Sequence, residues 1–258
     1  MKLNYITWMN ENIYIDTFLI RNFHIDINGC LSIKYLFDFL LECTKKHGNL
    51  LNVGIDELFT QGNTWMLSRM HLQINKFPEE NEEIKIKTWP SGTRGIFSRR
   101  DYIVENSRNE QILKATSGWL VVNLEKRRPV RLTEQIINIQ NNDARRAIKD
   151  DFKKFIIPDK FNNEYSSAAR LNSIDFNKHF TSSSYVAAII DALDMDFYKN
   201  HRLEQLELDF KTEILPMQSY VVKSNIENNN GKSRINFTIR NKENNTVHLN
   251  AKSLWKKN

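Results

Sequence analysis

An acid, an amide and an imidazole stand on alternate positions in the segment "SIDFNKHF", as Asp175, Asn177 and His179. In an extended segment, side chains two residues apart point the same way, so these three groups could share one face. A carboxylate or an imidazole can move a proton, and an amide can hold a carbonyl oxygen, which suits the attack of water on an activated acyl group. A polar turn that caps a helix uses the same residue types, and the spacing alone leaves both interpretations open.

An apolar helical pattern follows directly, in "SSSYVAAIIDAL" (182–193). Thr181 and Ser182 are its candidate N-caps. The free N–H groups and the positive end of a helix that starts here would point at a developing oxyanion.

The polar pattern occurs twice in the chain. Residues 26–35 read "DINGCLSIKY" and residues 175–185 read "DFNKHFTSSSY", so that Cys30 stands where His179 stands. A buried helix is predicted over residues 31–48 after the first copy. Runs typical of strands follow each copy, at 65–74, 82–89, 97–106 and 112–124, and at 203–213, 218–227, 233–241 and 246–256. The pattern predicts an α+β fold in two similar halves, each a long helix followed by about four antiparallel strands.

The segment between the halves is basic. From Lys126 to Lys160 there are ten Lys or Arg and five Asp or Glu, which accounts for most of the chain's net charge of +6. Such a surplus favours an acidic partner, although a solvated connector would have the same composition. The segment has few aromatic residues and no recognised binding motif, which argues against nucleic acid. Within it, "DARRAIKDDFKKF" (143–155) predicts a short amphipathic helix.

Composition excludes several classes of protein. The 258 residues include 40% hydrophobic residues, but no apolar run approaches the ~20 residues of a membrane span. The first sixteen residues are interrupted by polar side chains and do not resemble a signal peptide, so we expect a soluble, cytoplasmic protein. Cys30 and Cys43 form no CxxC, and the six His show no metal-binding spacing, so neither a metal nor another cofactor is expected.

Two longer segments carry a resemblance to a known family. "TWPSGTRGIFSRRDYIV" (88–104) and "ATSGWLVVNLEKRRPVRL" (115–132), together with "SIDFNKHF", closely resemble the acyl-ACP thioesterases in their bacterial form. The resemblance covers most of the chain. It implies two hot-dog folds in tandem, each a long helix wrapped by an antiparallel β-sheet, with an N-terminal domain at 1–130, a basic linker at 131–165 and a catalytic C-terminal domain at 166–258.

The resemblance also implies an activity and a partner. The family hydrolyses the thioester between a fatty acyl chain and acyl carrier protein. Carrier proteins are acidic, which would give the basic segment its partner, with Arg127, Arg128 and Arg131 as candidate contacts. Attraction of this kind speeds encounter and weakens with salt.

The candidate catalytic residues follow from the same resemblance. Asp175, Asn177 and His179 match the family's Asp-x-Asn-x-His, and Glu213 in "LDFKTEILP" matches its second acid. Ile214 stands where plant members have Cys, so a cysteine nucleophile is excluded there. In the expected mechanism, Glu213, oriented by or paired with His179, activates water. Asn177 and helix N–H groups hold the carbonyl, and Asp175 orients the site. Direct attack by Asp175 is a second route, and a Glu213 that only forms a surface ion pair is the structural alternative.

The chain also departs from the family. Phe180, Thr181 and Ser182 replace its usual Val-Asn-Asn, so hydroxyl groups must replace the amides, or the site is altered or impaired. With Cys30 and no matching acid, the first half is expected to be non-catalytic. Its apolar helix residues are candidates for an acyl-chain pocket or simply for the core: Tyr35, Leu36, Phe39 and Leu40.

Two rival functions remain open at this stage. One is a different hot-dog enzyme, such as an acyl-CoA thioesterase or a hydratase, and the other is a non-catalytic protein that binds acyl carriers or acyl chains. The acyl-chain preference and the oligomeric state, with a homodimer among the options, do not follow from the sequence.

Overall fold

The computed structural model describes residues 13–139, 146–175 and 178–258. The N-terminal half contains β1 (Tyr14–Leu19), a 3-10 turn (Asn22–His24), α1 (Ile33–Leu50), α2 (Ile55–Phe59), β2 (Asn63–Ile74), β3 (Glu83–Arg94), β4 (Phe97–Asn106), β5 (Gln111–Asn123), β6 (Arg128–Pro129) and α3 (Glu134–Asn138). The C-terminal half contains β7 (Asn163–Ala168), a 3-10 turn (Leu171–Ser173), α4 (Ser182–Asp191), α5 (Met195–Asn200), β8 (His201–Phe210), β9 (Ser219–Asn229), β10 (Lys232–Asn241) and β11 (Val247–Lys257). The order of strand, turn, two helices and four strands is the same in both halves.

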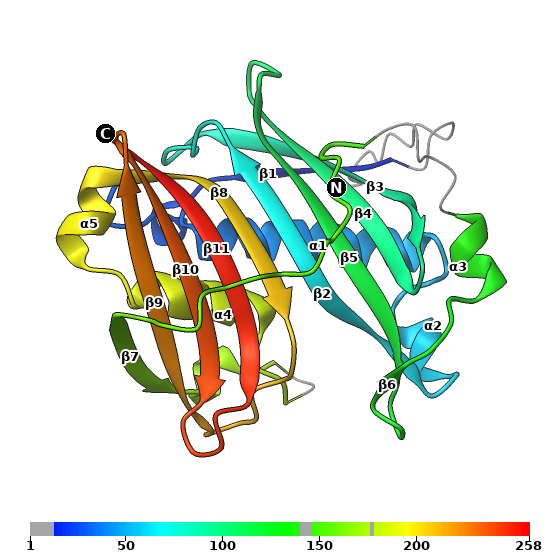
Figure 1. Ribbon diagram of the computed structural model, residues 1–258. Helices are drawn as coiled ribbons and strands as arrows, with labels where there is room; N and C mark the ends of the chain where they lie inside the picture. Colours follow the sequence, from blue (N-terminus) through cyan, green and yellow to red (C-terminus); the bar gives the residue numbers. More distant parts are fainter. Residues whose placement is uncertain (1–12, 140–145, 176–177) are drawn as a thin grey trace.

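The two halves share one antiparallel sheet (Figure 1). Its strand order is β1-β3-β4-β5-β2-β8-β11-β10-β9-β7. From one edge to the centre the order is β1-β3-β4-β5-β2, and from the other edge it is the equivalent β7-β9-β10-β11-β8. The halves meet where β2 pairs with β8, with His71 opposite Glu207. The predicted α+β fold and its eight long strands are confirmed. The edge strands β1 and β7, which precede each copy of the polar motif, were not predicted.

The core lies between the sheet and its two main helices. Helix α1 presents Leu36, Phe37, Leu40 and Cys43 at helical spacing to the sheet, and these side chains are buried. Helix α4 contacts α1 from the other half, and a single cluster of buried side chains runs across both halves. The second helix is shorter than the first because α4 ends at Asp191 and Asp194 caps the new helix α5.

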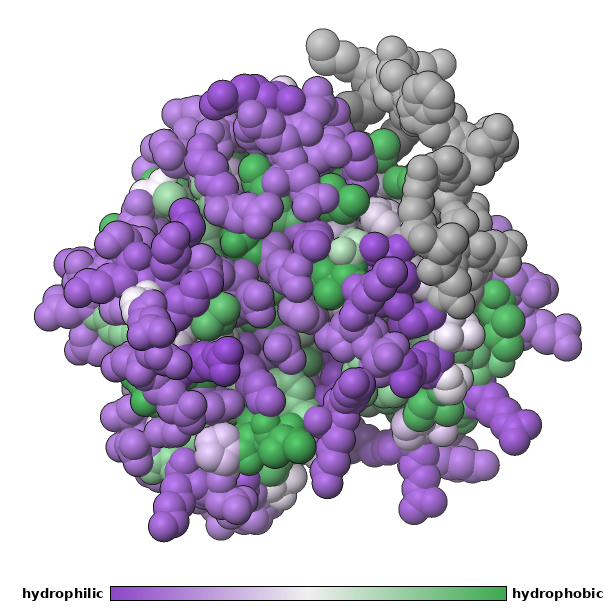
Figure 2. Space-filling model, turned by 45° about the horizontal axis from the view of Figure 1, so that its top comes forward, coloured by the Kyte–Doolittle hydropathy of each residue, from purple (hydrophilic) through white to green (hydrophobic). Residues whose placement is uncertain are grey.

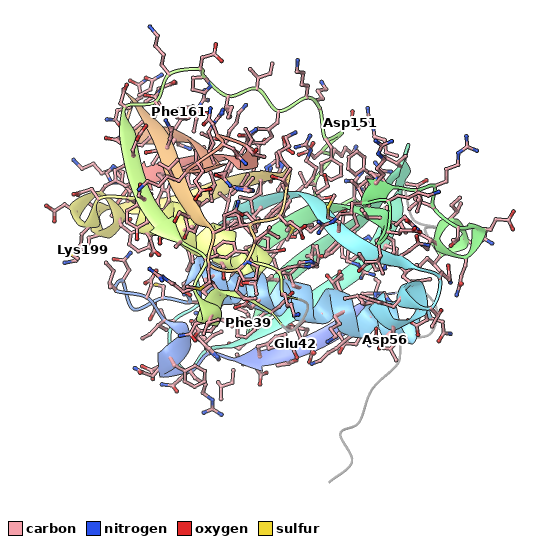
Figure 3. The ribbon with its side chains drawn as sticks, turned by 90° about the horizontal axis from the view of Figure 1, so that it is seen from below. Phe39, Glu42, Asp56, Asp151, Phe161 and Lys199 are labelled. Atoms are coloured by element: carbon pink, nitrogen blue, oxygen red, sulfur yellow. The ribbon has the colours of Figure 1, made fainter. Side chains whose placement is uncertain are left out.

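The segment that joins the halves crosses the opposite face of the sheet. Figure 3 places Asp151 and Phe161 on one side of the sheet, and Phe39 and Glu42 of α1 on the other. Seen with the top of Figure 1 tipped forward, the surface is mostly hydrophilic, with hydrophobic residues in small separate groups (Figure 2).

The helix predicted over 143–155 is wrong for its described part, because residues 146–155 contain no helix. Tertiary contacts hold this segment in an irregular conformation instead, with Phe152 at a φ of 47°. Arg146 Nε donates to Asp101 Oδ2 at 3.0 Å, and Asp150 lies 2.9 Å from His71 Nδ1. The Phe152 ring lies against Gly118 of β5, where no Cβ intervenes. Residues 143–145 lie outside the described residues.

No helix among the described residues is both long and apolar enough to cross a membrane. Within the same residues, no group of three or more His, Cys, Asp or Glu side chains is placed to hold a metal ion.

Candidate active site

The described ends of the two copies of the polar motif make the same backbone hydrogen bonds. In the second copy, Asp175 N donates to His179 O at 2.9 Å, and Asp175 Oδ1 accepts from His179 N at 2.9 Å. In the first copy, Asp26 N donates to Cys30 O at 2.8 Å. Each loop turns through a residue with positive φ, Gly29 at 73° and Lys178 at 64°. The repeat in the sequence is therefore a repeat in structure, whereas Asn177 lies outside the described residues.

His179 and Glu213 lie together at the C-terminal end of β8. The His179 Nε2 atom is 3.1 Å from Glu213 Oε2. Both side chains reach solvent, with 47% of His179 and 34% of Glu213 exposed. A water molecule or a substrate can thus reach the imidazole.

A residue of the N-terminal half completes this cluster. Arg127, in the turn between β5 and β6, donates from Nη2 to Glu213 Oε1. Its backbone is in the left-handed region, with φ of 50°. One carboxylate oxygen of Glu213 therefore contacts the Arg127 guanidinium, and the other contacts the His179 imidazole. Arg127, a candidate contact for the carrier protein, thus bonds to a side chain of the other half. The two residues are 86 positions apart, so the contact leaves no local signal in the sequence.

Tyr185 of α4 fixes the chain next to Glu213. Its hydroxyl accepts from Ile214 N at 2.9 Å and donates to Thr212 O at 3.4 Å. Burial raises the pKa of Tyr185, so the hydroxyl stays protonated and can make both bonds. Ile214 is fully buried, which turns the neighbouring Glu213 toward the surface. Tyr185 was not predicted, because a tyrosine in an apolar helix is indistinguishable from a core residue in the sequence.

Hydroxyl groups form the start of α4. Thr181 is the N-cap, and its Oγ1 accepts from Ser184 N at 3.2 Å. The same oxygen lies 2.6 Å from Ser184 Oγ. Ser182 is the first helical residue, so its N–H and that of Ser183 are without partners inside the helix. In this protein, hydroxyl groups therefore cap the start of α4.

The other predicted contacts lie in two places. Leu36, Phe39 and Leu40 are buried in the core under the sheet, where Phe39 stacks on Phe18 with ring centroids 4.4 Å apart, and Tyr35 is half-buried beside them. Arg128 and Arg131 are exposed, close in sequence to Arg127.

Comparison with known proteins gives a consistent picture. A family model described as the acyl-ACP thioesterase N-terminal domain matches residues 11–140, and one described as the acyl-ACP thioesterase C-terminal domain matches residues 157–257. The chloroplastic palmitoyl-acyl carrier protein thioesterase of Gossypium hirsutum is 25% identical over 236 residues, which cover 84% of this chain and 57% of that protein. The chloroplastic oleoyl-acyl carrier protein thioesterase 2 of Arabidopsis thaliana is 22% identical over 222 residues, which cover 78% of this chain and 59% of that protein. The chain thus spans less than two thirds of the length of these relatives.

Two solved structures have the same fold. The acyl-ACP thioesterase from Bacteroides thetaiotaomicron superposes with a TM-score of 0.84 at 22% identity, over 95% of this chain and 98% of that chain. The 12:0-ACP thioesterase from Umbellularia californica superposes with a TM-score of 0.85 at 18% identity, over 96% of this chain and 98% of that chain.

Proposed function

Since the chain belongs to the acyl-ACP thioesterase family, we propose that it hydrolyses the thioester between a fatty acyl chain and acyl carrier protein. The products are a free fatty acid and the carrier with its thiol restored. The observation that carries the proposal is the contact of His179 with Glu213, at a solvent-accessible position next to the start of α4. The proposal extends to a cytoplasmic location and to fatty acid biosynthesis.

We assign the role of general base to His179. Both oxygens of Glu213 are engaged, by Arg127 and by His179 Nε2, so the carboxylate is placed to hold the imidazole rather than to take a proton from water. His179 Nδ1 has no hydrogen bond among the described residues and can receive that proton. Glu213 then stabilises the imidazolium by its negative charge. This changes the expectation that Glu213 itself activates water.

The reaction takes two proton transfers. Water attacks the thioester carbonyl carbon while His179 takes its proton, which gives a tetrahedral intermediate with a negative oxygen. That oxygen is stabilised by the N–H groups of Ser182 and Ser183 at the start of α4, and by the Asn177 amide that the family resemblance implies. When the carbon–sulfur bond breaks, the imidazolium returns the proton to the departing thiolate. Asp175 acts as a positioning residue, because its carboxylate accepts a hydrogen bond from the backbone N–H of His179 and so closes the loop.

The carrier protein would dock beside Arg127. Arg128 and Arg131 are exposed there and present positive charge to an acidic protein, while Arg127 touches Glu213. The thioester at the end of the carrier's flexible arm would then lie near His179. The acyl chain itself would enter the N-terminal half between α1 and the sheet, where Leu36, Phe39 and Leu40 would have to move apart.

The catalytic assignment is tested by the release of thiol from long-chain acyl-ACP. His179→Ala should lower kcat/KM about 10²–10⁴-fold, as expected for loss of a general base. Glu213→Gln should lower it less, because the amide still accepts a hydrogen bond but loses its charge. Glu227→Gln, at an exposed position on β9, is the matched control and should leave turnover unchanged. Turnover that survives His179→Ala in a folded protein would refute the assignment.

The choice of carrier over coenzyme A needs a second substrate. Arg128→Glu with Arg131→Glu should raise KM for acyl-ACP and leave KM for acyl-CoA nearly unchanged, because only the carrier protein reaches these side chains. Equal effects on both substrates, or a preference of the wild type for acyl-CoA, would favour a hot-dog acyl-CoA thioesterase. No turnover of either substrate by the wild type would favour a non-catalytic binding protein.

A further inference from the structure

A cavity of about 430 Å³ lies between the two halves, at the first copy of the polar loop. This is a volume typical of a small-molecule site. It is bounded by the loop, the start of α1, the segment after β2, helix α5 and the ends of β8 and β11. The lining residues used below are Cys30, Phe77, Tyr198, Lys199, Arg202 and Trp255.

The cavity occupies the position in the N-terminal half that the candidate active site occupies in the C-terminal half. Cys30 stands in the loop where His179 stands. Phe77 comes three residues after the end of β2, and Glu213 comes three residues after the end of β8. The base and its acid are thus replaced by a thiol and a phenyl ring. Burial, followed by the charge of Asp26, raises the pKa of the Cys30 thiol, which makes it a poor nucleophile as well.

The remaining acid of the loop is already engaged. Tyr198 of α5 donates to Asp26 Oδ2 at 2.5 Å, and the Asn28 side chain donates to Tyr198 O at 3.3 Å. Asp26 Oδ1 accepts from Asn28 N at 2.8 Å. These bonds tie α5 of one half to the loop of the other, and they form one wall of the cavity. The site has therefore lost its chemistry while its walls are held in place.

The cavity has an apolar part, and its polar lining carries charges of both signs. The apolar part consists of Ile33, Phe77, Ile190, Leu203 and Trp255, and Trp255 is almost fully buried. Of the charged lining residues, Asp26 and Glu79 lie at the loop and the segment after β2, and Lys76 has an acidic partner, Glu82, at 3.5 Å. The side chains of Lys199 and Arg202 have no ion pair or hydrogen bond to any described residue. Figure 3 shows Lys199 at the outer end of α5.

We propose that this cavity is a second binding site, for an amphipathic anion with an aliphatic body and a carboxylate head. The aliphatic body would lie against Phe77 and Trp255, and the carboxylate would lie between Lys199 and Arg202. A fatty acid has this chemistry and is the product of the proposed reaction, so the identity of the ligand rests on the proposed function. The protein would thus hold product at a site that cannot hydrolyse thioesters.

The test is a titration of the full chain with laurate, in which binding is measured by tryptophan fluorescence and by calorimetry. The His179→Ala protein should bind laurate with a change in fluorescence that disappears in the Trp255→Phe variant. Lys199→Glu with Arg202→Glu should weaken this binding about tenfold or more, because two attractive charges become repulsive. Arg234→Glu with Lys242→Glu makes the same change of net charge at exposed positions of the second half and should leave the affinity unchanged. Dodecanol, which lacks the charged head, should not distinguish the two double variants.

Three results would overturn the proposal. They are a fluorescence change that persists in Trp255→Phe, an equal laurate affinity in both double variants, and binding of 4′-phosphopantetheine without binding of laurate. The measurement needs no turnover, so it fails separately from the proposed function. Wild-type protein that hydrolyses acyl-ACP without binding laurate here refutes only the second site.

Discussion

The buried carboxylate of Asp101 links the connecting segment to the sheet. Asp101 lies in β4 and is fully buried. Its Oδ1 accepts from Ser91 Oγ at 2.9 Å and Thr116 Oγ1 at 2.6 Å. Its Oδ2 accepts from Arg146 Nε at 3.0 Å and Ala147 N at 2.6 Å. Four donors thus converge on one side chain.

Replacing Asp101 by Asn isolates the contribution of its charge. The amide can turn its oxygen to Arg146 and Ala147, and its NH₂ group to the two hydroxyls, which can rotate and accept. The hydrogen bonds then survive, but the Arg146 side chain, only 8% exposed, loses its counter-charge. Removing one partner of a buried ion pair lowers the free energy of unfolding by about 3–5 kcal/mol. Because the hydrogen bonds are retained, we expect Asp101→Asn to cost about 3 kcal/mol, the lower end of this range. Arg146→Met should cost a similar amount, because it leaves the carboxylate buried without a cation.

The double variant distinguishes this reasoning from simple disruption of packing. With both charges gone, the penalty of the unpaired charge disappears, so the loss should be smaller than the sum of the single losses by about 1–3 kcal/mol. The assay is urea unfolding of the wild type, both single variants and the double variant at one pH and salt concentration. Additive losses, or single losses below about 1 kcal/mol, would refute the claim that this ion pair fastens the segment.

Three further perturbations follow from the structure. Burial and the charge of Arg100 lower the pKa of His47 to about 3 from 6.5, so only the unfolded chain takes up this proton below pH 6.5. Stability should therefore fall as the pH drops from 6.5 toward 3, by up to about 1.4 kcal/mol per pH unit, and His47→Gln should reduce this slope in urea unfolding across pH; an unchanged slope would contradict the assignment. A Cβ at Gly118 would lie 2.9 Å from the Phe152 ring, so Gly118→Ala should displace the connecting segment and speed its cleavage in limited proteolysis, and unchanged cleavage would argue against the contact. Thr181→Ala removes the N-cap of α4 and should cost about 1 kcal/mol in urea unfolding, a similar loss to Ser32→Ala at the start of α1, while no loss would contradict the capping role.

The fold was predictable where local patterns decide the structure. The two Asp-x-Asn motifs with their following helices, and eight strands of alternating or continuous apolar residues, were read from the sequence. Strand β7 was missed because four of its six residues are exposed and its edge position needs no apolar alternation. The helix expected over 143–155 has the right periodicity, but the bonds of Arg146 and Asp150 to the sheet outweigh it. Propensity decides less than tertiary contacts in a segment this short.

The candidate site was predictable only in part. Asp175, His179 and Glu213 were named from a motif and a resemblance, and the structure brings the last two together. Two other contacts of the site were not predicted. Arg127 contacts Glu213, 86 positions away, and Tyr185 bonds to Ile214, 29 positions away. The first contact depends on how the halves meet and the second on how α4 packs against the end of β8, and no local pattern reports either.

The pairing of β2 with β8 within a single chain has an evolutionary consequence. In a dimer of identical subunits, one codon specifies both equivalent positions, and a substitution that improves one site is imposed on the other. Joining the two copies covalently removes that constraint. Cys30 could depart from His179, and Phe77 from Glu213, without disabling the second copy. Mutations can then accumulate in one copy while the other keeps its residues.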